Sequence, residues 1–269
     1  SQSVYAALDE VFTPADLSSF QMTFDIPQMP ITDIRSGNYD IFNNGCFNQT
    51  GMCFEANLDT QYITAVGRGI NTTFWYDDNQ GHSPFVSWMF NVTNDPNPPL
   101  VHSISYSSNE YYMDVNEMRA FNMEAKRFGV RGGTVVVASG DDGVANFQAR
   151  SNPKKCGYNP SFPASSPYVT AVGATQGPES SSTEIACTSD AGGVITTGGG
   201  FSTIFSTPSY QTSTVKNYFS TLPSNQQPAS GYATSGRGYP DVAMAGFNYE
   251  VIIGGQQYML SGTSASAPV

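Results

Sequence analysis

Ser264 has neighbours that suit a nucleophile. It stands in the run 261–268, which reads SGTSASAP and predicts the entry to a helix. The N-terminus of a helix offers free N–H groups to a developing oxyanion, and small neighbouring side chains let a substrate backbone approach. The run therefore predicts a serine that attacks a carbonyl carbon, with a plain polar helix start as the alternative.

Two carboxyl groups could supply the base that such a serine needs. Glu55 and Asp59 lie four residues apart in the run 55–61, EANLDTQ, and the helical spacing puts them on one face. Close carboxylates can share a proton and titrate at separate apparent pKa values, so one can transfer a proton while the other orients it. Two solvated acids on a helix surface are the alternative.

The histidines are the competing candidates for that base. Gly-Thr-Ser followed by Ala and Pro is typical of the subtilisin-type nucleophile turn, whose serine normally works with a histidine. The sequence has only His82 and His102, and neither stands in the His-Gly-Thr setting of a subtilase. We expect both to be surface or structural residues, and a subtilase with a histidine base stays open as an alternative.

These residues need elements that bring them together. Leu58, Tyr62 and Ile63 give the segment 55–65 a helical periodicity. Thr13 and Pro14 predict an N-cap and first turn, and Gly254-Gly255 predicts the turn of a hairpin over 249–260. The remaining expected elements are a helix over 114–128 and strands over 100–106, 134–138 and 168–174.

Alternating strands and helices of this length predict an α/β fold with a doubly wound, mostly parallel sheet. Ligands bind at the carboxyl ends of the strands in such sheets. The run 139–143, SGDDG, follows the strand over 134–138 directly, so Asp141 and Asp142 are expected there.

Composition narrows the class of partner. The 269 residues include 11 Lys+Arg and 22 Asp+Glu, which gives a net charge of −11, while hydrophobic residues make up 39%. The apolar content predicts a packed core, and we draw no domain boundary within 1–269. Because the sequence has no run of Lys and Arg, neither nucleic acid nor an anionic membrane surface is an expected partner. No apolar stretch approaches the roughly 20 residues that a membrane-spanning helix needs.

Cysteines and sequons point to an oxidising compartment. Cys46, Cys53, Cys156 and Cys187 form no metal-binding spacing, and the pairs 46–53 and 156–187 are the natural closures among three possible pairings. Buried free thiols are the alternative. Sequons at Asn48, Asn71 and Asn91 fit glycosylation in a secretory pathway.

The motifs, taken in order, resemble the sedolisin family of serine-carboxyl peptidases, which includes tripeptidyl-peptidase I. The resemblance extends over nearly the whole chain. It rests on the segments 2–20, 55–61, 101–106, 138–141 (ASGD), 162–167 (FPASSP), 198–202 (GGGFS), 237–242 (RGYPDV) and 261–264 (SGTS).

The resemblance implies a subtilisin-like fold and a division of labour among four residues. Ser264 would be the nucleophile, Glu55 its general base and Asp59 the acid behind Glu55. Asp141 would stand at the oxyanion, where only a protonated carboxyl group can donate, so the site should work in acid. Asp142 is expected to be a solvated turn residue.

The resemblance also implies a substrate cleft beside the strand end Ser105-Tyr106-Ser107 and the turn Ser139-Gly140. The family usually has glycine where this sequence has Ser107, so the extended substrate should be accommodated differently there. Release of tripeptides and internal cleavage both stay open.

The resemblance further implies segments beyond this chain. The family continues past the nucleophile helix into a segment that binds structural calcium, and it has a segment before Gln2. We expect no metal site in the present chain, and a C-terminal segment or processed chain of the same precursor as its partner. The implied function is that of an acid-active peptidase, secreted or in a lysosomal or vacuolar lumen. The rival hypothesis is a non-catalytic binding or structural chain on a peptidase fold.

Overall fold

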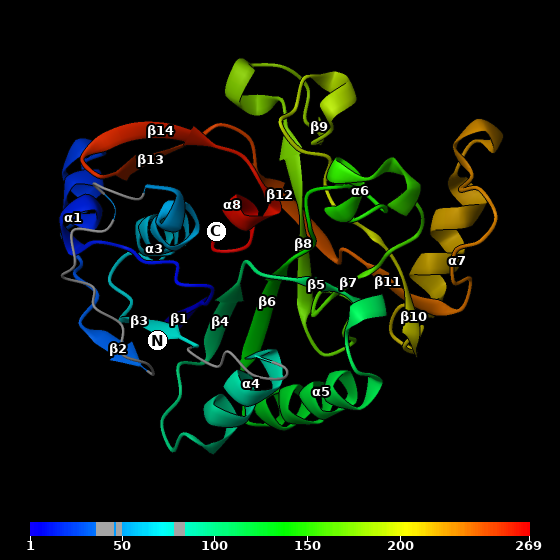
Figure 1. The fold of residues 1–269 in the computed structure, drawn as a ribbon, viewed down its shortest axis with the longest axis horizontal. Coiled ribbons are helices and arrows are strands. Elements are labelled where there is room, and N and C mark those ends of the chain that lie inside the picture. Colours follow the sequence, from blue (N-terminus) through cyan, green and yellow to red (C-terminus); the bar gives the residue numbers. More distant parts are fainter. Residues whose placement is uncertain (36–45, 47–49, 78–83) are drawn as a thin grey trace.

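A mostly parallel sheet forms the centre of the molecule (Figure 1). The computed structural model describes residues 1–35, 46, 50–77 and 84–269. The strand order is β12-β8-β6-β4-β1-β3-β2 with every neighbouring pair parallel, and β9 adds antiparallel to β8. The strands are β1 (Gln2–Ala6), β2 (Asp33–Arg35), β3 (Thr72–Tyr76), β4 (Val101–Ile104), β6 (Thr134–Ala138), β8 (Thr170–Gln176), β9 (Ile185–Ala186) and β12 (Val242–Ala245).

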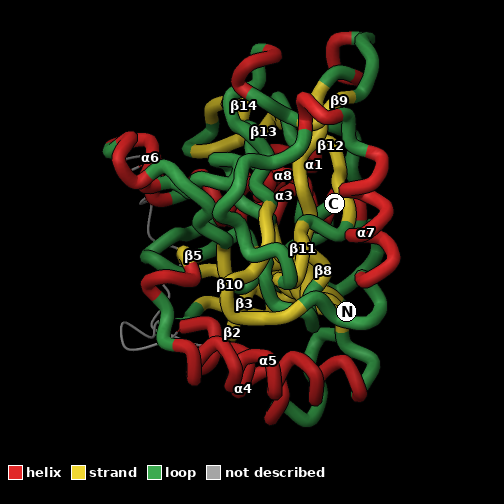
Figure 2. The backbone as a smooth tube through the Cα atoms, turned by 90° about the vertical axis from the view of Figure 1, so that its right-hand side faces the viewer, coloured by secondary structure: helices red, strands yellow, loops and turns green. Residues whose placement is uncertain are grey.

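Helices cover both faces of this sheet, so the expected doubly wound α/β fold is confirmed. α4 and α5 lie together on one side, away from α1, α3 and α8 (Figures 1 and 2). Figure 1 shows α7 beside the β10–β11 pair. The helices are α1 (Pro14–Thr23), α3 (Phe54–Val66), α4 (Pro84–Asn94), α5 (Val115–Val130), α6 (Gln148–Ser151), α7 (Thr212–Thr221) and α8 (Thr263–Ser266).

Local signals set several helix starts. The Thr13 hydroxyl accepts from the Asp16 N–H at 3.1 Å with Pro14 in the first turn, so the expected cap of α1 is confirmed. The Asp114 carboxylate accepts from two N–H groups at the start of α5, so Asp114 caps the helix and the expected segment 114–128 begins one residue later, at Val115. Six short 3-10 helices lie in the connections described: Thr50–Met52, Glu110–Tyr112, Pro153–Lys155, Pro178–Ser180, Ser189–Ala191 and Ser224–Gln226.

Short antiparallel pairs complete the fold. The expected hairpin forms from β13 (Tyr249–Ile253) and β14 (Gln256–Leu260), and Gly254 and Gly255 turn at φ of 60° and 74°. Both glycines adopt the left-handed region that a two-residue hairpin turn requires. The other pairs are β5 (Ser108–Asn109) with β7 (Ser161–Phe162) and β10 (Gly200–Ser206) with β11 (Gly236–Tyr239).

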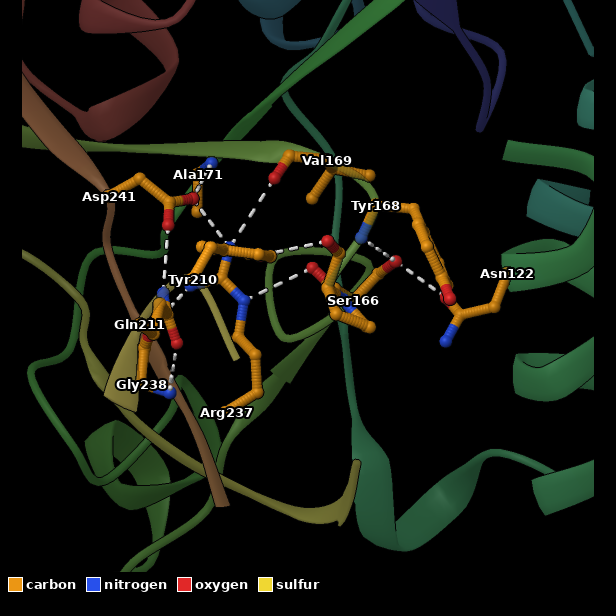
Figure 3. Close-up of polar contacts among 11 residues, drawn as sticks. Asn122, Ser166, Tyr168, Val169, Ala171, Tyr210, Gln211, Arg237, Gly238 and Asp241 are labelled. Carbon is orange, nitrogen blue, oxygen red and sulfur yellow. Dashed lines mark hydrogen bonds and ion pairs between the residues drawn. The ribbon is translucent and has the colours of Figure 1, made fainter. Parts of the chain in front are cut away.

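A buried arginine of β11, Arg237, connects this strand to the segment before β8 and to Asp241 (Figure 3). The guanidinium of Arg237 is inaccessible and pairs with Asp241. It donates to the carbonyl oxygens of Ser166 at 3.1 Å and Val169 at 3.4 Å, just before β8. Asp241 in turn accepts from the Ala171 N–H at 2.8 Å, so one charge pair holds the edge of the sheet together.

Arg237→Met should lower the free energy of unfolding by about 3–5 kcal/mol, because it leaves the Asp241 carboxylate and three backbone carbonyl groups without the buried guanidinium. Urea unfolding at constant m-value would measure this loss. Arg127→Met is the matched control, since Arg127 is 56% exposed in its pair with Glu124 and should cost about 1 kcal/mol or less. Equal costs for the two variants would contradict a central role for Arg237.

Candidate active site

Ser264 lies at the beginning of α8, where the chain arrives from β14 through an extended Gly262. Its hydroxyl donates to the Ser105 carbonyl at 3.4 Å. That carbonyl belongs to the segment directly after β4, so the serine faces the carboxyl end of a central strand. The expected helix entry at this run is confirmed.

Glu55 and Asp59 lie in the first two turns of α3, and both interact with the Ser105 side chain. The Asp59 side chain is fully buried and accepts from the Ser105 hydroxyl at 2.8 Å. Glu55 is half-buried, and its Oε1 is closed to solvent. Ser105 thus contacts Ser264 through its backbone carbonyl and Asp59 through its hydroxyl.

Burial raises the pKa of the Glu55 carboxyl, the negative charge of Asp141 adds to the rise, and hydrogen bonding from the Ser264 and Ser105 hydroxyls opposes it. Burial likewise raises the pKa of Asp59, with the charge of Glu55 as the next cause. The two groups therefore hold at least one proton between them over a wide pH range. The alternative of two solvated acids on a helix surface is wrong.

Asp141 lies in the turn after β6 and reaches the residue before Ser264. Its Oδ1 accepts from the Thr263 N–H at 2.8 Å and from the Thr263 hydroxyl at 3.0 Å. The Gly140 N–H donates to the same hydroxyl at 3.0 Å, and Gly140 has a φ of 106° that favours glycine. Burial raises the pKa of Asp141, although the Thr263 hydrogen bonds partly offset it.

A cavity of about 130 Å³ opens beside Ser264. Four of the five residues expected to contact substrate line it: Ser105, Tyr106, Ser107 and Gly140. Its other lining residues are Ala138, Asp141, Asp142, Gly143, Asn146, Phe147, Arg150, Ser161 and Thr263.

Ser139, the fifth expected substrate contact, does not line this cavity. It is buried, and its hydroxyl donates to the Gly198 carbonyl at 2.8 Å. A Cβ at position 198 would lie 2.3 Å from the Ser139 carbonyl oxygen. Gly198 therefore lets the GGGFS segment support the turn that carries Asp141.

The structure also brings in residues that the sequence prediction had not assigned. Arg150 pairs with Asp142 at the cavity, and the Asp142 side chain is only 15% exposed, so the expectation of a solvated turn residue is wrong. Asn146 donates to the Ser161 hydroxyl at 3.2 Å inside the lining. No spacing in the sequence connects these residues, because separate loops supply them.

His102 is a structural residue rather than a base. It lies in β4, fully buried between the rings of Trp88 and Phe128 at centroid distances of 5.2 and 5.3 Å. Burial lowers its pKa to about 3, which keeps the imidazole neutral. His82 lies outside the described residues.

One of the two expected disulfides is present. Cys46 and Cys53 are bonded, with a Cα–Cα distance of 5.7 Å. The predicted pair Cys156–Cys187 is wrong in this structure: both are free thiols. Cys187 is buried against the Ile195 carbonyl, whereas Cys156 is exposed at the end of a 3-10 turn. The number of residues between them would allow a disulfide, but the two thiols lie in different environments.

Two of the sequon asparagines, Asn71 and Asn91, are exposed, and Asn48 lies outside the described residues. Over the described ranges, no group of three or more His, Cys, Asp or Glu side chains is placed to hold a metal ion. Across the same part of the chain, no helix has both the length and the apolar character to cross a membrane.

Fold and site together define a subtilisin-like α/β architecture in which a serine faces carboxyl groups. No family model matches the chain. The chain is 33% identical to tripeptidyl-peptidase 1 of Dictyostelium discoideum over an alignment of 273 positions. The alignment covers 100% of this chain and 41% of that protein. It is 37% identical to tripeptidyl-peptidase 1 of Macaca fascicularis over 276 residues, again 100% of this chain and 46% of the relative.

Among solved structures, the chain is similar to Pseudomonas sedolisin, a serine-carboxyl proteinase, with a TM-score of 0.72 and 24% sequence identity. The match covers 99% of this chain and 71% of the sedolisin chain, and it supports a shared fold. These matches confirm the sedolisin-family assignment made from the motifs. The chain spans less than half the length of the two curated relatives described.

Proposed function

We propose that this chain is the catalytic part of an acid-active serine-carboxyl peptidase that hydrolyses peptide bonds through an acyl-enzyme on Ser264. The proposal rests on one observation: Ser264, Glu55 and Asp59 all contact Ser105, which lines the cavity. A binding chain would need none of these groups together.

In the proposed reaction, the Ser264 oxygen attacks the substrate carbonyl carbon while Glu55 takes the hydroxyl proton. A proton on Asp59 would bond to Glu55 and keep Glu55 oriented toward the serine. Glu55 then returns its proton to the leaving amine as the peptide C–N bond breaks. Water then attacks the acyl carbon while Glu55 takes one of its protons, and Glu55 returns that proton to the Ser264 oxygen as the ester C–O bond breaks and the acid product leaves.

Asp141 would stabilise the oxyanion by donating a proton from its carboxyl group. It can donate only when protonated, because a carboxylate would repel the negative oxygen. Its pKa is raised by burial, so Asp141 keeps its proton to a higher pH than an exposed aspartic acid does and loses it as the pH rises further. Activity should therefore be high in acid, roughly at pH 3–5, and fall toward neutrality.

The pH profile of Asp141→Asn tests this role. An amide donates at every pH, so the ratio of kcat/KM at pH 6.5 to that at pH 4 should rise about tenfold over wild type. Asp142→Asn is the matched control, since Asp142 lies beside Asp141 at the rim but pairs with Arg150. A wild-type optimum at pH 7–8, or equal ratios in the two variants, would refute the assignment.

The proposed substrates are peptides or unfolded proteins, cleaved either as tripeptides from a free N-terminus or internally. The names of the relatives favour the first mode. A tripeptide reporter with a free N-terminus and an internally quenched, N-acetylated peptide separate the two modes. Failure to cleave both at any pH between 3 and 8 would favour the non-catalytic alternative.

We also propose that the active protein contains residues beyond this chain and that structural calcium binds there. The greater length of the relatives supports the first point. The described acids of the present chain do not fit the six to eight oxygen ligands that calcium takes. The melting temperature of residues 1–269 should therefore be the same in calcium and in EDTA, and a rise of several degrees with calcium would contradict this.

A secretory or lysosomal location is part of the same proposal. The Cys46–Cys53 disulfide suits an oxidising compartment, and exposed Asn71 and Asn91 can carry glycans there. Intact mass before and after enzymatic deglycosylation would test it, because an unchanged mass in the native protein would remove the support from the sequons.

A further inference from the structure

The outer edge of β13 is held by side chains of two helices. β13 pairs with β14 along one side, and on its other side Ile252 presents both its N–H and its carbonyl group. Backbone groups on the edge of a sheet need partners, because they would otherwise pair with another chain. Figure 1 shows the β13–β14 hairpin beside α1 and α3, and these helices supply the partners.

Gln61 of α3 makes the central contact of this edge. Its Nε2 donates to the Ile252 carbonyl at 2.7 Å, and its Oε1 accepts from the Ile252 N–H at 3.0 Å. The side-chain amide thus exchanges two bonds with one residue, as the partner residue in an antiparallel ladder does. Gln61 is inaccessible to solvent, and its Nε2 also donates to Asn57 Oδ1 at 3.4 Å. The orientation of the amide is therefore fixed.

Two further side chains flank this contact along β13. The Tyr62 hydroxyl donates to the Glu250 carbonyl at 2.9 Å. At the other end, the Asp16 carboxylate of α1 accepts from the N–H groups of Gly254 and Gly255, both at 2.9 Å. The amide pair lies between these contacts, so the position of the hairpin along α3 is fixed in both directions.

The hairpin leads to the proposed nucleophile. β14 ends at Leu260, and Ser264 follows four residues later, at the beginning of α8. Ile253 of β13, Ala265 of α8 and Leu58 of α3 lie in one buried apolar cluster. Because α3 also carries the two proposed catalytic acids, a shift of the hairpin along α3 would move the serine relative to its base.

We propose that Gln61 is a positioning residue for Ser264: by holding Ile252, it fixes the hairpin and the start of α8 on the helix that carries the catalytic acids. The catalytic meaning of this role rests on the function proposed above. Within the part of the chain that the structure describes, the cavity lining includes no residue of β13 or β14. Gln61 should therefore affect kcat, which depends on the distance between serine and base, more than KM, which depends on substrate contacts.

Gln61→Met tests this role. Methionine keeps the length of the side chain, but it has no N–H donor and only a weak acceptor. At pH 4, kcat for a peptide substrate should fall about 10- to 100-fold, with KM changed less than about threefold, because a small misplacement of a reacting group has a large effect. A kcat within about twofold of wild type would overturn the proposal.

Gln211→Met is the matched control, because Gln211 makes the same pair of bonds far from the serine. Its Nε2 donates to the Gly238 carbonyl of β11 at 2.7 Å, and its Oε1 accepts from the Gly238 N–H at 3.2 Å (Figure 3). This variant should lose stability while the folded protein keeps kcat within about twofold of wild type. An equal loss of kcat in the two methionine variants would reflect general destabilisation and overturn the proposal.

Gln61→Glu gives a test that does not depend on the folding of the methionine variant. A protonated carboxyl group has one O–H donor and one acceptor, so it can make the same two bonds to Ile252. Burial favours the protonated form in acid. At pH 4 this variant should keep at least about half of the wild-type kcat, and a fall of about tenfold or more would overturn the proposal.

Hydrogen exchange tests the positioning without any peptidase activity. The Ala265 N–H donates to the Gly262 carbonyl at 3.1 Å at the start of α8. In Gln61→Met, the N–H groups of Ile252 and Ala265 should both exchange at least about tenfold faster than in wild type, and neither should change in Gln211→Met. Faster exchange at Ile252 alone would overturn the proposal. Faster exchange at both sites in a protein without peptidase activity would support the role of Gln61 and reject the proposed function.

Discussion

Ser264→Ala should lower kcat for peptide cleavage by about 10⁴- to 10⁶-fold while the protein stays folded. The oxygen that forms the acyl-enzyme is gone, and no neighbouring group can replace it at the same place. Its loss should cost little stability, because the bond that the Ser264 hydroxyl donates to the Ser105 carbonyl is long, at 3.4 Å. Single-turnover kinetics together with circular dichroism would measure both effects.

Ser261→Ala is the control for this substitution. Ser261 lies three residues before Ser264, and its hydroxyl accepts from the Asn248 N–H at 3.0 Å. It should retain most of the turnover. A folded Ser264→Ala protein with more than about one-hundredth of wild-type activity would show that another nucleophile carries the reaction.

The sequence predicted the parts of the site that depend on local spacing. The four-residue interval between Glu55 and Asp59 requires one helical face, and α3 places both acids toward Ser105. The turn after β6 follows from a buried apolar strand that ends at a glycine-rich run, which is where parallel sheets place their sites. Short-range patterns were sufficient for both.

Strand ends were harder to predict than strand existence. The segment 100–106 was expected to be one strand, but β4 ends at Ile104 because Ser105 and Tyr106 leave the sheet to line the cavity. β8 begins two residues later than expected, at Thr170, after the carbonyls of Ser166 and Val169 turn toward Arg237. In both cases a tertiary contact, absent from the local pattern, decides the boundary.

Contacts between distant segments could not be predicted from one sequence. Nothing in its local context indicates that the Asp16 carboxylate accepts from the Gly254 and Gly255 N–H groups, both at 2.9 Å, in a hairpin turn more than 230 residues later. The loop length between Cys156 and Cys187 permitted a bond, yet burial separates one thiol from the exposed position of the other. Pairing of this kind depends on the packed fold rather than on spacing.

Glu55→Gln should lower kcat by about 10³- to 10⁴-fold, since glutamine keeps the shape of the side chain but cannot take the Ser264 proton. Asp59→Asn should lower it by roughly 10- to 100-fold, because Asp59 acts through Glu55 and the base itself remains. The double variant should be little worse than Glu55→Gln alone, as expected of groups that act as one unit.

Stability distinguishes loss of the base from loss of the fold. Burial raises the pKa of the coupled Glu55 and Asp59 carboxyl groups, that of Glu55 to about 8 from an ordinary value of 4.5, so the pair keeps one shared proton between these values while the unfolded chain has released it. Wild-type stability should therefore fall as the pH rises through this window, while the uncharged glutamine has no such loss. Melting temperatures of Glu55→Gln and wild type should agree near pH 4, and the variant should melt higher at pH 7.5. An inactive Glu55→Gln protein that melts lower than wild type at both pH values would mean that Glu55 is needed for folding. Full activity in a folded Glu55→Gln protein would exclude Glu55 as the base.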